Sequence, residues 1–200
     1  MNIKTRYITN RDVDKVVEIH MEAFSDFFLT TLGRSFLKAY YKSFIDNKEG
    51  VSICAYDNDG IILGFSVGAL NGKGFHKRLI FKNIIRFSIQ FIRIIFTYPG
   101  AIYRLLRNMD KRTKQKIEEK YSELLSIGIC NTAKGKGIGS ILLKRFEVEL
   151  KLKNSKIVTL TTDYNDNDDV VNFYRKAGYE IFSEFTTFPD RRMYKMLKIL

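Results

Sequence analysis

The chain has few of the residues that hold small or fibrous proteins together. Its two cysteines, Cys54 and Cys130, lie far apart in the sequence, and there is no Cys-x-x-Cys pair. This spacing argues against a disulfide framework and a cysteine-ligated zinc site, and it fits a reducing compartment. With 2 prolines and 13 glycines, the composition is not that of a collagen-like or disordered chain. The first residues lack the apolar run of a signal peptide, so we expect a cytoplasmic location.

The composition is that of one globular domain, expected to cover residues 1–200. Hydrophobic residues make up 45% and charged residues 28% of the chain. The net charge of +12 is uneven, because residues 73–120 contain 13 Lys and Arg against 3 Asp and Glu. About a quarter of the chain therefore carries nearly all of the positive excess, and we treat 71–123 as a basic insertion.

Hydrophobic periodicity predicts an α/β fold. Strands are expected over 3–8, 51–56, 61–70, 124–129, 157–161, 179–188 and 193–197. One helix is expected to begin at residue 13 and a second to follow Gly33. Four more are expected over 80–98, 101–119, 138–150 and 167–177. The 124–129 strand lacks alternation, as expected for a strand that is covered on both faces. The helix over 80–98 is amphipathic, with a wide apolar arc and basic residues on another side.

A glycine-rich turn lies between the 124–129 strand and the next helix, and it reads Lys134-Gly135-Lys136-Gly137-Ile138-Gly139-Ser140. Closely spaced glycines let backbone N–H groups approach a ligand, and the helix N-terminus behind them favours an anion. The turn therefore predicts a pyrophosphate site, with a tight strand–helix turn and two solvated lysines as the alternative. A phosphate-binding P-loop does not fit, because it needs a Lys-Ser/Thr pair after its last glycine, and here Ser140 is followed by Ile141 and Leu142. A dinucleotide fingerprint also fails, because its third glycine is missing.

The turn and a second motif together resemble the GCN5-related N-acetyltransferase (GNAT) superfamily. The coenzyme A motif of that family, Arg/Gln-x-x-Gly-x-Gly/Ala, corresponds to Lys134, Gly137 and Gly139. Its Asn-x-x-Ala-x-x-Phe-Tyr signature, followed by Gly-Phe, is similar to the run Asn167, Val170, Phe173, Tyr174, Gly178 and Tyr179. The resemblance covers 1–70 and 124–200, and 71–123 departs from it. It implies a mixed, mostly antiparallel central sheet that splays between two strands and is flanked by helices, here with a helical insertion.

The resemblance also implies roles for individual residues. Backbone groups of Ile127, Gly128 and Ile129 would pair with the pantetheine arm as an added strand would. The pyrophosphate would be held by the turn, listed as Lys134, Gly135, Lys136, Gly137, Ile138, Gly139 and Ser140. Asn167 would bind the pantetheine side of the cofactor. Tyr174 would lie near the sulfur and act as general acid, the alternative being a core aromatic.

The general base is not singled out by any spacing. Glu22, Asp26, Glu123 and Asp163 are candidates, and Glu123 at the start of the central strand is the first choice. Cys130 is read as a small buried hydrophobe, not a nucleophile. Direct acyl transfer requires no metal, and no metal site is expected.

The sequence thus predicts an acetyl-CoA-dependent N-acetyltransferase acting on a primary amine of a small molecule, with an amino sugar as the working hypothesis. The alternative is a non-catalytic basic module that binds an anionic membrane or nucleic acid.

Three interpretations of the basic insertion stay open. Its apolar arc could pack on the domain or on a second subunit, which would give a homodimer. Its positive face could attract an anionic acceptor, or the helix could lie on an anionic membrane. Nucleic acid is not expected, because the aromatic residues follow the apolar arc and do not form a stacking platform.

Overall fold

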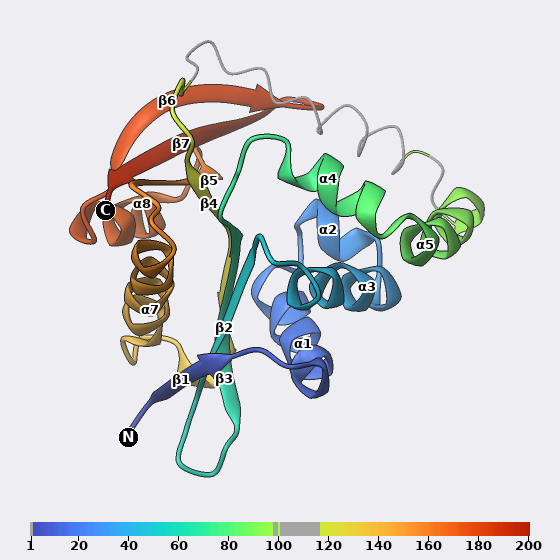
Figure 1. Ribbon diagram of the computed structural model, residues 1–200, viewed down its shortest axis with the longest axis horizontal. Helices are drawn as coiled ribbons and strands as arrows, with labels where there is room; N and C mark the ends of the chain where they lie inside the picture. The colour runs from blue at the N-terminus through green and yellow to red at the C-terminus, as the bar shows by residue number, and fades with distance from the viewer. Residues whose placement is uncertain (1, 98–99, 101–116) are drawn as a thin grey trace.

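A seven-stranded mixed sheet organises the protein, as seen in a computed structural model that describes residues 2–97, 100 and 117–200 (Figure 1). In spatial order the strands are β1 (Lys4–Tyr7), β2 (Gly50–Tyr56), β3 (Ile62–Ala69), β4 (Ser122–Ile129), β5 (Ile157–Asp163), β7 (Arg191–Ile199) and β6 (Glu180–Thr187). Neighbouring strands are antiparallel except for the parallel pair β4–β5. The predicted mixed, mostly antiparallel sheet is confirmed.

Helices cover both faces of this sheet (Figure 1). On one face lie α7 (Ile138–Leu152) and α8 (Asp168–Lys176). The other face carries α1 (Val13–Ala23), α2 (Phe28–Thr31), α3 (Arg34–Ile45), α4 (Phe75–Lys82) and α5 (Ile84–Thr97). Two short 3-10 turns, Asn10–Asp12 and Asn131–Ala133, precede α1 and the glycine turn.

The core lies on both sides of β3, where large side chains from the two helical layers meet the sheet. Phe65 of β3 packs edge-on against Tyr41 of α3, with ring centroids 5.3 Å apart. On the other face, Phe146 of α7 is fully buried. A Cβ at Gly68 would lie 2.4 Å from its ring, so glycine is what lets α7 approach β3 closely.

The central feature is the separation of β4 from β5. Parallel pairing is limited to three positions, Ser122–Leu124 against Val158–Leu160. Beyond them, β4 remains paired only with β3. In that pairing Val67 faces Ser126 and Gly68 faces Leu124, so Leu125 forms a β-bulge. The bulge bends β4 where it leaves β5, and the sheet opens into a splay.

The insertion is helical where the structure describes it, but its helix is interrupted. The apolar spacing predicts one helix over 80–98, whereas the structure has α4 and α5, which meet at Asn83. The Asn83 Nδ2 donates to the Leu79 carbonyl oxygen at 3.0 Å, a local bond that competes with helix continuation. The second basic helix, expected over 101–119, falls mainly on residues outside those described.

Candidate active site

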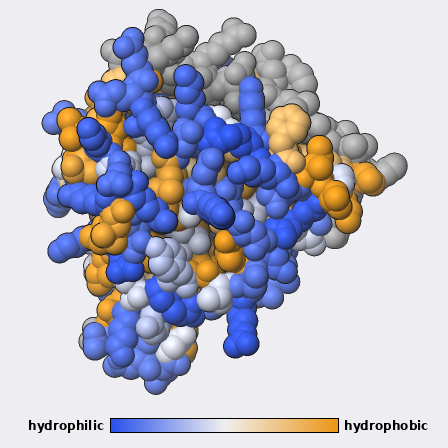
Figure 2. Space-filling view, in the orientation of Figure 1, coloured by the Kyte–Doolittle hydropathy of each residue, from blue (hydrophilic) through white to orange (hydrophobic). Residues whose placement is uncertain are grey.

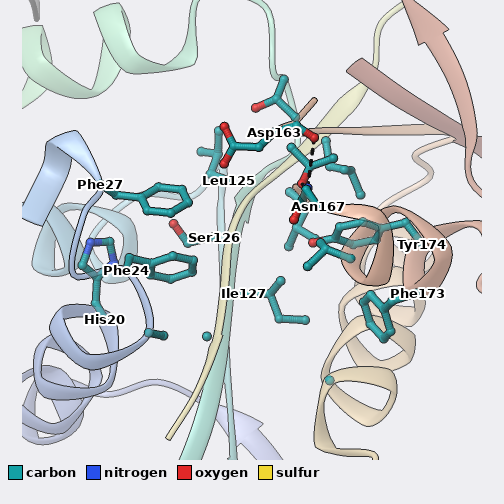
Figure 3. Close-up of a pocket in the computed structure, with 18 of the residues that line it drawn as sticks. His20, Phe24, Phe27, Leu125, Ser126, Ile127, Asp163, Asn167, Phe173 and Tyr174 are labelled. Atoms are coloured by element: carbon teal, nitrogen blue, oxygen red, sulfur yellow. Dashed lines mark hydrogen bonds between the residues drawn. The ribbon is translucent and has the colours of Figure 1, made fainter. Parts of the chain in front are cut away.

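A cavity of about 650 Å³ lies in the splay between β4 and β5. Figure 3 shows two groups of side chains on opposite sides of the β4 backbone. His20, Phe24 and Phe27 lie on one side, and Asn167, Phe173 and Tyr174 lie on the other. The side chains of the strand divide in the same way: Ser126 projects to the first side and Ile127 to the second. The cavity therefore joins two chemically different walls through one gap in the sheet.

The exposed edge of β4 forms the floor of the cavity. Ile127, Gly128 and Ile129 all line it, and they lie beyond the last β4–β5 pair. Strand backbone that has lost its neighbour presents N–H and C=O groups to any extended ligand. This edge is suited to accept a pantetheine-like arm as an added strand.

The glycine turn lies at one end of the cavity and opens α7. Gly135 and Gly137 adopt left-handed φ angles of +77° and +75°. A Cβ at either position would meet no atom within 4 Å, so the space in front of the turn is open. The first intrahelical bond runs from the Ile141 N–H to the Gly137 carbonyl at 3.2 Å, which leaves the preceding first-turn amides available to an anion.

The lysines of the turn have different placements. Lys134 lines the cavity. The Lys136 Nζ donates to the Thr132 carbonyl oxygen at 2.8 Å and so folds back over the turn. Gly139 also lines the cavity, and a Cβ there would lie 3.3 Å from Ile129 Cδ1. Gly139 thus keeps α7 close to β4.

Helix α8 supplies the second wall. Asn167 precedes the helix, and its Nδ2 donates to Thr162 Oγ1 at 2.7 Å and to the Asp163 carbonyl oxygen at 3.0 Å. These bonds tie the helix start to the end of β5. Tyr174 is 6% exposed, and its hydroxyl points toward the splayed strand (Figure 3). Burial raises the pKa of the Tyr174 phenol, so the group keeps its proton at neutral pH.

The opposite wall is aromatic and contains a buried imidazole. The His20 ring lies 4.9 Å from that of Phe24, which lies 5.0 Å from that of Phe27. His20 Nδ1 is 2.6 Å from the Tyr41 hydroxyl. His20 Nε2 is buried and has no hydrogen-bond partner within the described ranges. Burial lowers the pKa of His20 to about 4, so this ring is neutral near pH 7.

A charged pair closes the cavity near the ends of β5 and β7. Both carboxylate oxygens of Asp163 accept hydrogen bonds from the Arg191 guanidinium. The same guanidinium lies over the Phe27 ring, 4.4 Å from its centroid. Asp163, Arg191 and Phe27 all line the cavity, so this cluster connects the α1–α2 segment to the far strands.

Sequence reasoning missed His20 and Arg191 as site residues. His20 shares a three-to-four-residue spacing with Val13, Val16, Val17 and Phe24, which places it on the apolar face of the first helix. Its polar ring on an apolar face was the available signal. Arg191 had no local signal, because its partner Asp163 is a distant residue that only the β5–β7 pairing brings close.

Of the predicted base candidates, only Asp163 lines the cavity. Glu123 is buried, 8% exposed, and does not line it. A Cβ at Gly72 would lie 2.9 Å from Glu123 Cβ, so this carboxylate lies beside the loop that follows β3. Cys130 is buried, with Sγ 3.4 Å from Thr132 Oγ1, and it also lies outside the cavity lining. Among the residues that the structure describes, no three His, Cys, Asp or Glu side chains gather in a way that could hold a metal ion.

The model of the Acetyltransferase (GNAT) family matches residues 13–179 of the chain. The chain belongs to this family. No curated protein matches it. Solved structures of similar fold include the PaiA N-acetyltransferase of Thermoplasma acidophilum in complex with coenzyme A, at 15% identity, full coverage of both chains (100% each) and a TM-score of 0.61. The ribosomal-protein-alanine N-acetyltransferase of Brucella melitensis has 15% identity and a TM-score of 0.62, covering 98% of this chain and 99% of its own. YncA of Salmonella typhimurium, solved with acetyl-CoA, has 13% identity and a TM-score of 0.63, covering 100% of this chain and 95% of its own.

Family membership identifies this GNAT protein as an N-acetyltransferase that uses acetyl-CoA. The resemblance drawn from the two motifs is thereby confirmed, and so is the fold that it implied. The alternative of a non-catalytic basic module is not supported. The turn, the free strand edge and α8 surround one cavity, which fits the extended shape and the pyrophosphate of coenzyme A.

Proposed function

We propose that this GNAT enzyme transfers an acetyl group directly from acetyl-CoA to a primary amine of a small molecule, with an amino sugar as the working acceptor. The observation that carries the proposal is the single cavity that joins the cofactor wall to the aromatic wall through the splay. Two reactants that enter from opposite sides of β4 would meet at this gap. Holding them together there supplies most of the proximity and orientation that an amine and a thioester lack when they are free in solution.

The cofactor wall would hold the molecule at three places. The β4 edge at Ile127–Ile129 would pair with the pantetheine amides. Lys134 and the first-turn amides of α7 would hold the pyrophosphate, together with the backbone of the turn (Gly135, Lys136, Gly137, Ile138, Gly139 and Ser140). Asn167 Oδ1 would accept a pantetheine N–H. When bound, acetyl-CoA supplies an activated acetyl thioester.

Tyr174 is proposed as the general acid. Its hydroxyl faces the β4 edge, and its raised pKa keeps the phenol protonated at neutral pH. The hydroxyl would therefore be available to donate its proton to the leaving sulfur as the C–S bond breaks.

Two residues are proposed as alternative bases for the acceptor-side proton, since both carboxylate oxygens of Asp163, the predicted candidate that lines the cavity, already accept hydrogen bonds from Arg191. Glu123 stays the base predicted from the sequence, at the start of β4. His20 is the second candidate, because it lines the cavity with a neutral ring whose buried Nε2 has no described partner. Glu123→Gln and His20→Asn distinguish them: the variant that lacks the true base loses turnover while its acetyl-CoA affinity is unchanged.

The composition of the acceptor wall supports a polar, ring-shaped amine. Phe24 and Phe27 provide flat apolar faces, whereas Ser126, Asp163 and Arg191 provide hydrogen-bonding groups. An amino sugar has both an apolar face and several hydroxyls, and it matches this combination.

The first experiment is calorimetric titration with acetyl-CoA, using ATP and NAD as control ligands. Selective binding that is lost in Gly137→Asp would support the turn as the pyrophosphate site, since the new carboxylate would lie where the phosphates are held. A folded protein without acetyl-CoA binding would refute the proposed cofactor site. Transfer of radiolabelled acetyl to amino-sugar nucleotides but not to peptide amines would then support the acceptor class, and the reverse pattern would remove it.

A homodimer stays a prediction.

A further inference from the structure

Helices α4 and α5 present an apolar surface that the fold does not use. Phe81 of α4 is 73% exposed, and on α5 Ile85, Ile89 and Ile92 are 79%, 65% and 58% exposed. Together with Ile84, at 55%, we call these five residues the isoleucine face. Figure 2 shows hydrophobic side chains gathered over α5, next to hydrophilic ones.

This face is distinct from the side of α5 that packs in the core. Phe87 is 1% exposed and meets Phe36 of α3, with ring centroids 5.6 Å apart. Phe91 packs beside it, 6.3 Å from Phe87 between ring centroids. The inner side of α5 therefore packs the helix against the domain, and the isoleucine face does not contribute to that packing. Exposed apolar patches of this kind mark interaction surfaces.

The charge that the two helices themselves carry is of one sign. Residues 71–97 contain 6 Lys and Arg and no Asp or Glu. Arg86 and Arg78 form ion pairs with Asp46 and Glu49, with guanidinium nitrogen to carboxylate oxygen distances of 3.0 and 2.9 Å. These two carboxylates, which lie outside the helices, offset part of the positive charge. Lys82, which is exposed, adds a cation next to Phe81. The surface remains basic and apolar together.

We infer that the isoleucine face docks the enzyme on an anionic lipid surface. Isoleucine and phenylalanine side chains would enter the boundary between headgroups and acyl chains, and the flanking cations would contact lipid phosphates. Two copies facing each other here would bring one cationic stretch against another, which disfavours a symmetric dimer through this face. A nucleic acid is a poorer occupant of this face, because its phosphates could contact the cations but the isoleucine side chains would remain without an apolar partner.

The contact is peripheral. In the part of the chain that the structure describes, no helix has the length and apolar character needed to cross a bilayer. In Figure 1, α4 and α5 lie on the same side of the sheet as α1 and α2, which supply the aromatic wall of the cavity. Docking would therefore hold the acceptor side, not the α7–α8 side, toward the lipid.

The test is co-sedimentation of the full chain with vesicles, which requires neither acetyl-CoA nor an acceptor and is independent of the proposed function. Vesicles of phosphatidylcholine alone are compared with vesicles containing about 30% phosphatidylglycerol, at roughly 0.1 M and 0.5 M salt. We expect binding to the anionic vesicles only, and weaker binding at the higher salt concentration.

Ile85→Asp should weaken that binding at least about tenfold, because it removes an inserted side chain and adds a repelled charge. Leu152→Asp is the matched control, since Leu152 is 72% exposed at the end of α7, away from the face, and it should bind as the wild type does. The inference is overturned if the folded wild type does not bind anionic vesicles, or if both variants bind equally. A lipid-free dimer that Ile85→Asp dissociates would also overturn it, by showing that a second copy covers the face.

Discussion

The buried imidazole of His20 makes the stability of this enzyme depend on pH. Burial lowers the pKa of His20 from the ordinary 6.5 to about 4 in the folded protein. Between these values the unfolded chain binds a proton that the folded protein excludes. Stability is therefore retained above pH 6.5 and falls as the pH is lowered toward 4.

The size of the effect follows from that shift. At about pH 5 the unfolded imidazole is almost fully protonated, whereas the buried one is almost fully neutral. Linkage then gives a loss of about 2 kcal/mol in the free energy of unfolding relative to about pH 7.5, approaching roughly 3 kcal/mol below both pKa values. This is a large part of the stability of a typical domain.

Urea unfolding followed by circular dichroism at the two pH values measures this loss. The His20→Asn variant keeps an amide near the Nδ1 position and has no titrating ring, so its loss should be smaller than that of the wild type by about 2 kcal/mol. His76→Asn is measured at the same two pH values, because His76 is the other histidine of the chain and this variant gives its separate contribution. Equal losses in the wild type and in His20→Asn would refute the buried, neutral imidazole.

Further variants test the site and the sheet. Tyr174→Phe should lower turnover about 100-fold while acetyl-CoA affinity stays within about twofold, since only a proton donor is removed; unchanged turnover in steady-state assays would remove Tyr174 as the acid. Arg191→Lys keeps the charge but loses the two-pronged contact with Asp163. It should raise KM for the acceptor and leave the affinity for acetyl-CoA, measured by calorimetry, unchanged. A weakened acetyl-CoA affinity would contradict the placement of Arg191 on the proposed acceptor side. Gly68→Ala would place a Cβ 2.3 Å from the Glu123 carbonyl oxygen of β4 and 2.4 Å from the Phe146 ring, and it should cost about 2 kcal/mol or more in urea unfolding; unchanged stability would contradict this close packing of β3 against β4 and α7.

The local elements could be predicted because their causes are local. Strands were expected over 51–56 and 61–70, and β2 and β3 form there. In the turn between them, Asp57 Oδ1 accepts backbone N–H bonds from Asp59 at 3.1 Å and from Ile61 at 2.9 Å, a local side-chain interaction typical of Asp in turns. The break at Asn83 was missed, because the apolar spacing continues across it and only a side-chain bond to the previous turn ends α4.

The sequence by itself determined the family and the cofactor. The glycine turn and the run from Asn167 to Tyr174 are short patterns whose chemistry depends on neighbours in the chain, and they were sufficient to identify the GNAT resemblance. The resemblance also implied the mixed, mostly antiparallel sheet, and periodicity predicted the strands and helices that build it.

The tertiary structure alone decided which residues line the proposed acceptor side of the cavity. The cavity exists because β4 and β5 pair at only three positions and then separate, which no local pattern encodes. Separation brings His20 of α1 opposite Tyr174 of α8, and the β5–β7 pairing joins Asp163 to Arg191. It also leaves Glu123 outside the cavity lining, although its position in the sequence favoured it. Contacts between residues distant in the chain depend on packing and register, and these are properties of the whole fold.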